Sequence, residues 1–351
     1  MPISADSPRV LFFEPPLNRQ TGGLQAALES LRTALPAAGI EPVVSSSIPE
    51  KLDPRVIAHF QGLWQPSHAG LAAKCRARGI PYLVSTHGML EPWAWHHKRW
   101  KKRPYFYLIE RRYLARARCL LATAEAEARN LAVFFPNTDI QFIPLGMTGD
   151  ARPDYSTARL HFGWRDDEWI LLFLSRIHEK KGLELLLDAL ADSESARPSS
   201  LRLVIVGGGA PRYVNRLKAQ CAAKQARLPR IEWHGERWGK EKWKYFQGAD
   251  LFCLPSHSEN FGLAVLDACQ VGTPPVTTTA TPWSSMLTEG RGYIAAPDAQ
   301  SVEGALRKAF QDGKADIARR ESIARWAHTN FSWDRLAVSY SALYRKIAST
   351  R

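Results

Sequence analysis

The fold of this 351-residue chain is constrained most by a regular alternation of short apolar runs with stretches of amphipathic helical spacing. In the first half, apolar runs of strand length lie at 10–13, 56–60, 82–85, 119–123 and 140–143. In the second half, they lie at 170–174, 201–206, 231–234, 251–254 and 275–278. Strands that alternate with helices favour parallel sheets covered by helices. The sequence therefore predicts an α/β protein with two doubly wound parallel sheets.

The length and a polar segment near the middle of the chain predict two domains. A single hydrophobic core seldom grows beyond about 250–300 residues, so two domains of ordinary size fit this chain better than one. The turn-rich stretch 148–154 is expected to link them. We therefore predict one domain over 1–147, a second over 148–332, and a long final helix that begins near Trp333.

The charge and the cysteines narrow the class of protein. A net charge of +13 calls for an anionic partner such as a nucleotide, a nucleic acid or acidic lipid headgroups. The five cysteines are scattered and form no Cys-x-x-Cys pair, which favours reduced thiols in the cytosol over a zinc site or a disulfide framework. The N-terminus lacks the layout of a signal peptide, and no apolar run approaches the roughly 20 residues that span a bilayer. We expect a cytosolic protein whose membrane contact, if any, is peripheral.

The most informative motif runs from Ser256 to Val276 and contains two acids, Glu259 and Asp267, eight positions apart. A short buried strand precedes it, so Glu259 is expected at the carboxyl end of that strand, where open α/β sheets bind ligands. The backbone N–H groups of residues 261–263 would open the next helix and form an anion site. An anion site flanked by acids suits a phosphate-bearing sugar better than a structural loop.

A basic loop follows the strand at 170–174 and precedes a helical pattern. Its side chains Arg176 and Lys181 could both contact a diphosphate, Arg through its planar fork and Lys as a point charge. The alternative is a solvated basic loop. Its place between a strand end and a helix start favours the functional interpretation.

Two glycine-rich turns could be either structural turns or parts of a ligand site. Gly207 and Gly209 follow a strand as in a dinucleotide-binding turn, but Arg212 occupies the place of the third glycine. These glycines fit a tight structural turn and the approach of a mononucleotide equally well. The turn at Thr21–Gly23 follows the first strand, and it could admit a phosphate or sugar or could be a plain turn.

A histidine follows the third strand of the first half. His87 lies beside a glycine at the carboxyl end of that strand, a position suited to ligand contact, although a hydrogen-bonded structural histidine is the alternative. A metal site is not expected. His96 and His97 are adjacent, and no acid or cysteine forms a helical ligand pair with them.

The segment from His96 to Arg118 carries nine Lys or Arg residues against the single acid Glu110, a net charge of +8. Aromatic side chains surround and interleave with these charges. Such a helix-compatible stretch favours docking to an anionic membrane surface or to the phosphates of a lipid-linked acceptor. A solvated helix with buried aromatics is the alternative. Nucleic-acid binding is not expected, because no recognised module accompanies the patch.

Taken in order, these fragments resemble a retaining family-4 glycosyltransferase of the GT-B fold. The resemblance rests on Gly22-Gly23, Thr86-His87-Gly88, Ile143-Pro-Leu-Gly146, Ser175-Arg176 with Lys181-Gly182, Val206-Gly-Gly-Gly209, Ala249-Asp250, and the block from Glu259 through Asp267 to Val276. The stretches His87–Trp93 and Thr281-Pro-Trp283 are similar to members that assemble bacterial polysaccharides.

The resemblance implies two Rossmann-like domains that face each other across a cleft, with residues 333–351 returning to the first. It implies catalytic roles for His87, Arg176, Lys181 and Glu259. It implies donor contacts from Gly22, Gly23, Arg176, Lys181, Gly207, Gly209, Glu236, Arg237, Glu259, Asn260, Phe261, Gly262, Leu263 and Asp267. Arg and Lys with helix N–H groups would replace a metal ion at the leaving group, and Glu259 would position the sugar without becoming a covalent nucleophile.

Two positions depart from the family pattern. Asp267 is one methylene shorter than the usual Glu, so its contact to the ribose would need a small helix shift or a bridging water. Leu145 replaces the Asn that commonly precedes the glycine at the exit of the first domain.

The resemblance leads to one main hypothesis and two alternatives. We expect a metal-independent glycosyltransferase that moves a sugar from a nucleotide-sugar donor to a lipid-linked saccharide acceptor in bacterial cell-surface or exopolysaccharide synthesis, on the inner face of the cytoplasmic membrane. A non-catalytic GT-B-like module that binds sugar or membrane is the first alternative. An NAD-linked oxidoreductase is the second, and it lacks the third glycine and a convincing ribose-binding acid.

Overall fold

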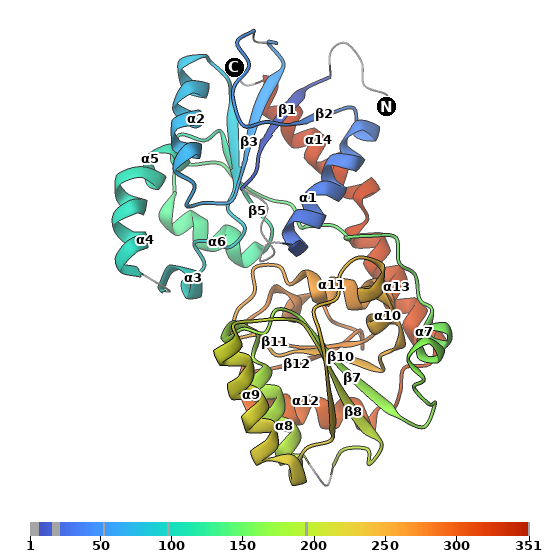
Figure 1. Cartoon of the computed structure of the whole chain (residues 1–351). Helices are drawn as coiled ribbons and strands as arrows, with labels where there is room; N and C mark the ends of the chain where they lie inside the picture. Colours follow the sequence, from blue (N-terminus) through green and yellow to red (C-terminus); the bar gives the residue numbers. More distant parts are fainter. Residues whose placement is uncertain (1–6, 16–21, 52, 97–98, 194–195, 350–351) are drawn as a thin grey trace. The chain divides into compact units, whose positions relative to one another are not determined.

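A computed structural model of the chain describes residues 7–15, 22–51, 53–96, 99–193 and 196–349. The chain divides into two compact units (Figure 1). The first unit combines Met1–Thr148 with Phe331–Arg351, and the second comprises Gly149–Asn330. No helix of the described ranges has both the length and the apolar character needed to cross a membrane.

The first unit is built on a parallel sheet with the strand order β2-β1-β3-β4-β5-β6. Its strands are β1 (Arg9–Phe13), β2 (Glu41–Val44), β3 (Val56–Gln61), β4 (Tyr82–Ser85), β5 (Cys119–Ala122) and β6 (Ile140–Phe142). Its helices are α1 (Gly22–Ala34), η2 (Leu35–Ala38), α2 (Pro66–Ala77), α3 (Pro92–His96), α4 (Arg99–Tyr105), the π-helical turn η3 (Phe106–Glu110), α5 (Arg111–Leu114), α6 (Glu125–Phe134) and α14 (Trp333–Ser349). The order reverses between β1 and β3, so ligand-binding loops are expected at the carboxyl ends of these strands.

The final helix α14 packs on the first sheet, as expected. Its apolar side chains Leu336, Tyr340 and Leu343 join a buried cluster with the strand residues Val10 and Ile57. Figure 1 shows α14 beside α1 on this face of the sheet. The other face carries a second buried cluster, in which helices α2, α5 and α6 contribute side chains. Both faces of the sheet are therefore covered, which explains why the central strands β3, β4 and β5 are buried along their whole length.

The second unit contains another parallel sheet, with the order β12-β11-β10-β7-β8-β9. Its strands are β7 (Trp169–Leu174), β8 (Leu201–Val206), β9 (Arg230–Gly235), β10 (Leu251–Leu254), β11 (Pro275–Thr278) and β12 (Tyr293–Ala295). Its helices are α7 (Tyr155–Phe162), η4 (Glu179–Lys181), α8 (Leu183–Asp192), α9 (Pro211–Ala223), η5 (Gln225–Arg227), α10 (Lys240–Gly248), α11 (Leu263–Gln270), η6 (Pro282–Ser285), α12 (Ala299–Gln311) and α13 (Ile317–Phe331). This is the Rossmann strand order, whose switch point lies between β7 and β10.

All the strands expected from apolar runs are present, and their ends differ from the prediction by at most one residue. Two strands were not expected. In β2, Pro42 interrupts the pattern and no residue is fully buried, while β12 is only three residues long. Both lie at the edge of a sheet, where one side of the strand is left without a partner. A short, half-exposed edge strand has little of the apolar signal that marks a central one.

Candidate functional site

The loops that follow β7 and β10 meet at the switch point of the second sheet. Gly182, at the end of the first loop, has φ +67, and a Cβ atom there would lie 2.0 Å from the carbonyl oxygen of Pro255 in the second. The backbone N–H of His257 donates to the carbonyl oxygen of Lys180 at 2.9 Å. Strand order thus brings together two loops that are about 80 residues apart in sequence, and each carries a predicted site residue.

A buried ion pair joins these loops. The Lys181 ammonium donates a short hydrogen bond to Glu259 Oε1, and the Ser256 hydroxyl donates to the same oxygen at 2.9 Å. The two charged side chains are only 13% and 8% exposed. Burial pushes the pKa of Glu259 upward, but the charges of Lys181 and Lys180 and the two hydrogen bonds outweigh it, so the pKa is lowered. Glu259 is therefore a carboxylate at neutral pH.

The start of α11 lies directly beside this pair in the chain. Gly262 caps the helix with φ +82, so α11 begins at Leu263. The first N–H groups of a helix lack acceptors one turn earlier in the helix, and here the backbone N–H of Val265 donates to the carbonyl oxygen of Gly262 at 2.9 Å. The fully buried indole of Trp283 donates a short hydrogen bond to the carbonyl oxygen of Phe261. A Cβ on Gly262 would lie 3.0 Å from Trp283 Nε1. From the sequence, Trp283 was noted only as part of the motif Thr281-Pro-Trp283. In the structure, it holds the turn at Phe261 and Gly262 that precedes α11.

Asp267 has a basic partner that the sequence did not predict. Lys242 on α10 donates to Asp267 Oδ2 at 2.9 Å, and the two side chains are 17% and 7% exposed. The pair forms because α10 and α11 lie next to each other. No sequence pattern connects Lys242 with a residue 25 positions later, so the contact follows only from the fold.

The other predicted residues of this unit lie along neighbouring loops. Arg176 follows β7, is exposed, and makes no ion pair or hydrogen bond with the described part of the chain. Glu236 follows β9 and is exposed, and Arg237 donates to its carbonyl oxygen at 2.9 Å. Arg176 and Glu236 are thus open to solvent at the carboxyl ends of the strands, where Glu259 also lies, while Arg237 is half-buried and lies 3.6 Å from Glu241.

The glycines after β8 have a packing role. A Cβ atom on Gly207 would lie 1.8 Å from the carbonyl oxygen of Ser175, and one on Gly209 would lie 2.0 Å from that of Ile177. The backbone N–H of Ile177 donates to the carbonyl oxygen of Gly208 at 2.7 Å. These contacts extend the pairing of β7 and β8 beyond the strands and support the loop that carries Arg176.

His87 belongs to the first unit, where it follows β4. Its Nε2 lies 2.8 Å from Gln61 Oε1 at the end of β3, and burial lowers the pKa of His87 to about 4. The imidazole is therefore neutral at physiological pH. In the same unit α1 begins at Gly22, and Gly23 is exposed, while Thr21 lies outside the described residues.

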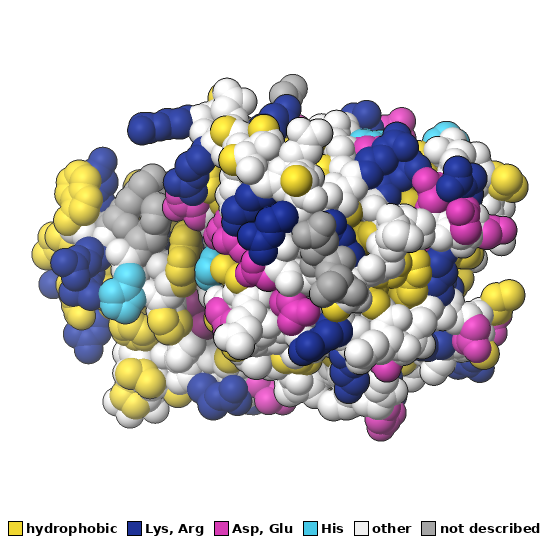
Figure 2. All heavy atoms as spheres, turned by 90° about the horizontal axis from the view of Figure 1, so that it is seen from below, with side chains coloured by type: hydrophobic (Ala, Val, Ile, Leu, Met, Phe, Trp, Pro, Cys, Tyr) yellow, Lys and Arg dark blue, Asp and Glu magenta, His cyan; other side chains and the backbone are white. Residues whose placement is uncertain are grey.

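The basic aromatic segment folds into α3, α4, η3 and α5, and we call its exposed side the basic aromatic surface. Its exposed apolar side chains include Trp100 (71%), Tyr107 and Leu108 (68%), with Arg99, Lys101, Arg111 and Arg112 among the exposed cations. Figure 2 shows yellow apolar and dark-blue basic side chains mixed at the left edge of the molecule, on the side of α4 in Figure 1. His97 and Lys98 lie outside the described residues.

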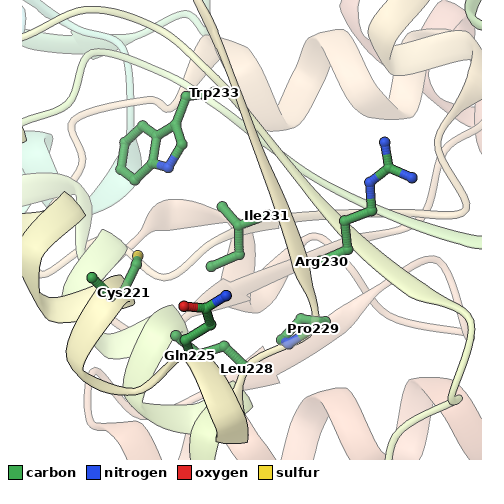
Figure 3. A pocket seen from close by; sticks show the side chains of 8 residues that line it. Cys221, Gln225, Leu228, Pro229, Arg230, Ile231 and Trp233 are labelled. Carbon is green, nitrogen blue, oxygen red and sulfur yellow. The ribbon is translucent and has the colours of Figure 1, made fainter.

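A cavity of about 450 Å³ lies elsewhere in the second unit, and Cys221, Leu228, Ile231 and Trp233 line it together with neighbours on α9, η5 and β9 (Figure 3). None of its lining residues is a predicted site residue. Across the part of the chain that the structure describes, no three His, Cys, Asp or Glu side chains are grouped as metal ligands would be.

Family models of glycosyltransferases match the sequence of both units of the chain. A model described as "Glycosyl transferases group 1" matches residues 155–326, and one described as "Glycosyltransferase Family 4" matches residues 45–148. The chain is similar to a D-inositol 3-phosphate glycosyltransferase from Xylanimonas cellulosilytica, at 29% identity over 265 residues. That alignment covers 69% of this chain, which spans 60% of the relative's length.

Two solved structures share the fold. Sucrose-phosphate synthase from Thermosynechococcus elongatus superimposes with a TM-score of 0.78 at 18% identity, covering 98% of this chain and 100% of that one. HepE from Anabaena, solved in complex with UDP and glucose, gives a TM-score of 0.73 at 17% identity, covering 96% of this chain and 99% of that one.

Proposed function

Because this chain belongs to glycosyltransferase family 4, we propose that it transfers a sugar from a nucleotide-sugar donor to a saccharide acceptor. The observation that carries the proposal is the buried Lys181–Glu259 pair, which lies beside the N-terminus of α11 at the switch point of the second sheet. This position combines a cation, a helix terminus suited to phosphate and a carboxylate suited to sugar hydroxyls. The UDP and glucose bound by HepE support a nucleoside diphosphate sugar as the donor.

In this proposal each residue has a defined contact. Arg176 and Lys181 bind the diphosphate, and the N–H groups of residues 261–263 bind its β-phosphate. Glu259 accepts hydrogen bonds from the sugar hydroxyls. Asp267 faces the ribose, with Lys242 holding its carboxylate in place at 2.9 Å.

The proposed chemistry retains the configuration of the sugar. The bond between C1 and the β-phosphate oxygen breaks, and C1 bonds to the acceptor hydroxyl oxygen on the same face. The acceptor proton passes to the departing phosphate oxygen. Arg176, Lys181 and the helix N–H groups stabilise the negative charge that develops on the leaving diphosphate, so the proposed reaction requires no metal ion.

The acceptor in this proposal is a lipid-linked saccharide at the inner face of the cytoplasmic membrane, in the synthesis of a bacterial cell-surface or exopolysaccharide. The basic aromatic surface supports this choice, because exposed Trp, Tyr and Leu side chains next to Lys and Arg suit an interface with anionic lipid.

We expect nucleoside diphosphates to stabilise the protein and turnover to continue in EDTA. A ligand at 100 times its Kd adds about 2.7 kcal/mol to the free energy of unfolding, so a panel of UDP, GDP and ADP should identify the base through the rise in Tm. Release of the nucleotide from the matching sugar donor is then measured with membrane extracts as acceptor. Stabilisation by NAD alone would instead favour an oxidoreductase. Nucleotide binding without transfer to any lipid-linked acceptor would favour a binding module.

We expect the basic aromatic surface to bind anionic liposomes, less strongly as salt increases. Each Lys or Arg near such a surface contributes about 1 kcal/mol. Neutralising Arg99, Lys101, Arg111 and Arg112 should therefore weaken the affinity for the liposomes, measured by co-sedimentation, by on the order of 1,000-fold.

The matched control for liposome binding removes four exposed charges from the second unit: Lys218, Arg227, Arg307 and Lys308. If both quadruple variants lose binding equally, net charge alone attracts the protein to the membrane. In that case the basic aromatic surface is not the docking site.

A further inference from the structure

The backbone of His87 has an unfavourable conformation that its surroundings must stabilise. His87 has φ +50, in the left-handed region that residues other than glycine seldom adopt. It lies in the short loop between β4 and α3, with Thr86 before it and Gly88 after it. Residues in this region cluster at functional sites and persist only where the surroundings hold them.

The buried carboxylate of Glu127 holds both neighbours of His87. Its Oε1 accepts hydrogen bonds from the Thr86 hydroxyl, at 2.5 Å, and from the backbone N–H of Gly88. Its Oε2 accepts from the backbone N–H and the hydroxyl of Thr123, at 2.8 and 3.1 Å. Four donors therefore surround one carboxylate on the first turn of α6, and they tie the loop after β4 to the end of β5.

Gln61 holds the ring of the same histidine. The Nε2 atom of His87 lies 2.8 Å from Gln61 Oε1, an oxygen that only accepts hydrogen bonds, and with the Gln61 amide assigned in this direction the ring proton is on His87 Nε2. The lone pair then lies on Nδ1. This atom is buried and has no hydrogen-bond partner among the residues that the structure describes.

We propose that Glu127 and Gln61 are positioning residues for His87, with Glu127 setting the backbone of its loop and Gln61 setting the tautomer and direction of its ring. The proposal rests on the proposed function, in which His87 contacts the sugar or the acceptor. Supporting residues of this kind typically matter about 10- to 100-fold for a site, because they fix the geometry of the group that reacts.

The test is a double-mutant cycle between Glu127 and His87. Glu127→Gln keeps the shape but turns an NH₂ group toward one pair of donors, so we expect kcat for sugar transfer to fall about 10- to 100-fold. The Kd for the nucleotide should not change, because its predicted site lies in the other unit. In a His87→Ala background, Glu127→Gln should cause no further loss. The matched control is Glu125→Gln, which removes an exposed carboxylate two positions earlier on the same helix.

Three outcomes would overturn the proposal. The first is an equal loss from Glu127→Gln with and without His87, because the residue would then act on folding alone. The second is a loss in Glu125→Gln that matches the loss in Glu127→Gln. The third is an unchanged kcat in Glu127→Gln.

A second variant and a second readout cover the remaining cases. If Glu127→Gln does not fold, Thr86→Val removes a single hydrogen bond to the carboxylate and is tested in the same cycle. If His87→Ala leaves no measurable rate, ¹⁵N spectra of the His87 ring report its tautomer. A tautomer that is the same in wild type and in Gln61→Leu would then reject the role of Gln61. The role of Glu127 concerns the backbone, so backbone ¹⁵N and ¹H chemical shifts of His87 that are the same in wild type and in Glu127→Gln would reject it. A wild-type protein that transfers no sugar would contradict the proposed function, a result distinct from any of these.

Discussion

Replacing Lys181 with alanine is expected to lower kcat/KM for sugar transfer by about 10²- to 10³-fold. In the proposed reaction, this ammonium neutralises charge on the leaving diphosphate and also holds the carboxylate of Glu259 in place. The substitution removes both the positive charge and the hydrogen bond to Glu259. Among the described side chains, only that of Ser256 would then still donate to this carboxylate. Steady-state rates with the donor identified by thermal shift measure the effect.

The same substitution should destabilise the protein in a manner that depends on pH. Removing one partner of a buried pair leaves an uncompensated charge, which typically costs about 3 kcal/mol. The pKa of Glu259 is lowered in the folded wild type, so its stabilising contribution is present at neutral pH and is lost as the pH falls through that folded pKa. Without Lys181, burial raises the pKa and protonation relieves the cost. The difference in unfolding free energy between wild type and variant should therefore shrink from pH 7 to about pH 4.

Lys180→Ala is the matched control for this experiment. Lys180 lowers the pKa of Glu259 through its charge but donates no hydrogen bond to it, so we expect a smaller effect on rate and stability. Glu259→Gln in the Lys181→Ala background should restore stability, because the uncompensated charge is gone. Equal effects of the two lysine substitutions would mean that only the net charge of the loop matters, and the specific role of Lys181 would be wrong.

The sequence predicted the strands of this fold well because their signal is local. A central strand such as β7 is buried along most of its length, so its residues are apolar in an unbroken run. The edge strand β2 lacks that run, and nothing in its local sequence separates it from a loop. The predicted positions of Glu259 and Lys181 followed in the same way, since each comes directly after a recognisable strand.

The contacts within the site could not be predicted in this way. The Lys181–Glu259 pair depends on β7 lying next to β10, and an alternation of strands and helices does not specify strand order. Glu127 reads as a solvated acid on the first turn of a helix, and only the tertiary structure buries it. The role of Lys242 could not be predicted either, because its partner Asp267 lies on another helix. Residues that position a site from a neighbouring element leave no local pattern.

Replacing Gly207 with alanine should decide between the two roles that the sequence left open for this turn. Gly207 has φ +149, and its Cβ would lie 1.8 Å from the carbonyl oxygen of Ser175, a backbone atom that cannot move without separating β7 from β8. We expect a loss of more than about 3 kcal/mol in unfolding free energy, and therefore a fall in Tm on the order of 10 °C. The fall in Tm is measured by thermal unfolding of the wild type and of Gly207→Ala without ligand.

Gly208→Ala provides the comparison one residue later. Its Cβ would meet the carboxyl group of Glu236, an exposed side chain that can rotate away, so the cost should stay within about 1 kcal/mol. If Gly207 were required for the approach of a nucleotide instead, Gly207→Ala would unfold at the wild-type temperature and lose only its affinity for the nucleoside diphosphate. A large fall in Tm for Gly207→Ala with little change for Gly208→Ala would instead show that the turn is built to join two strand ends. In that case its effect on the donor is indirect, through the loop that carries Arg176 and Lys181.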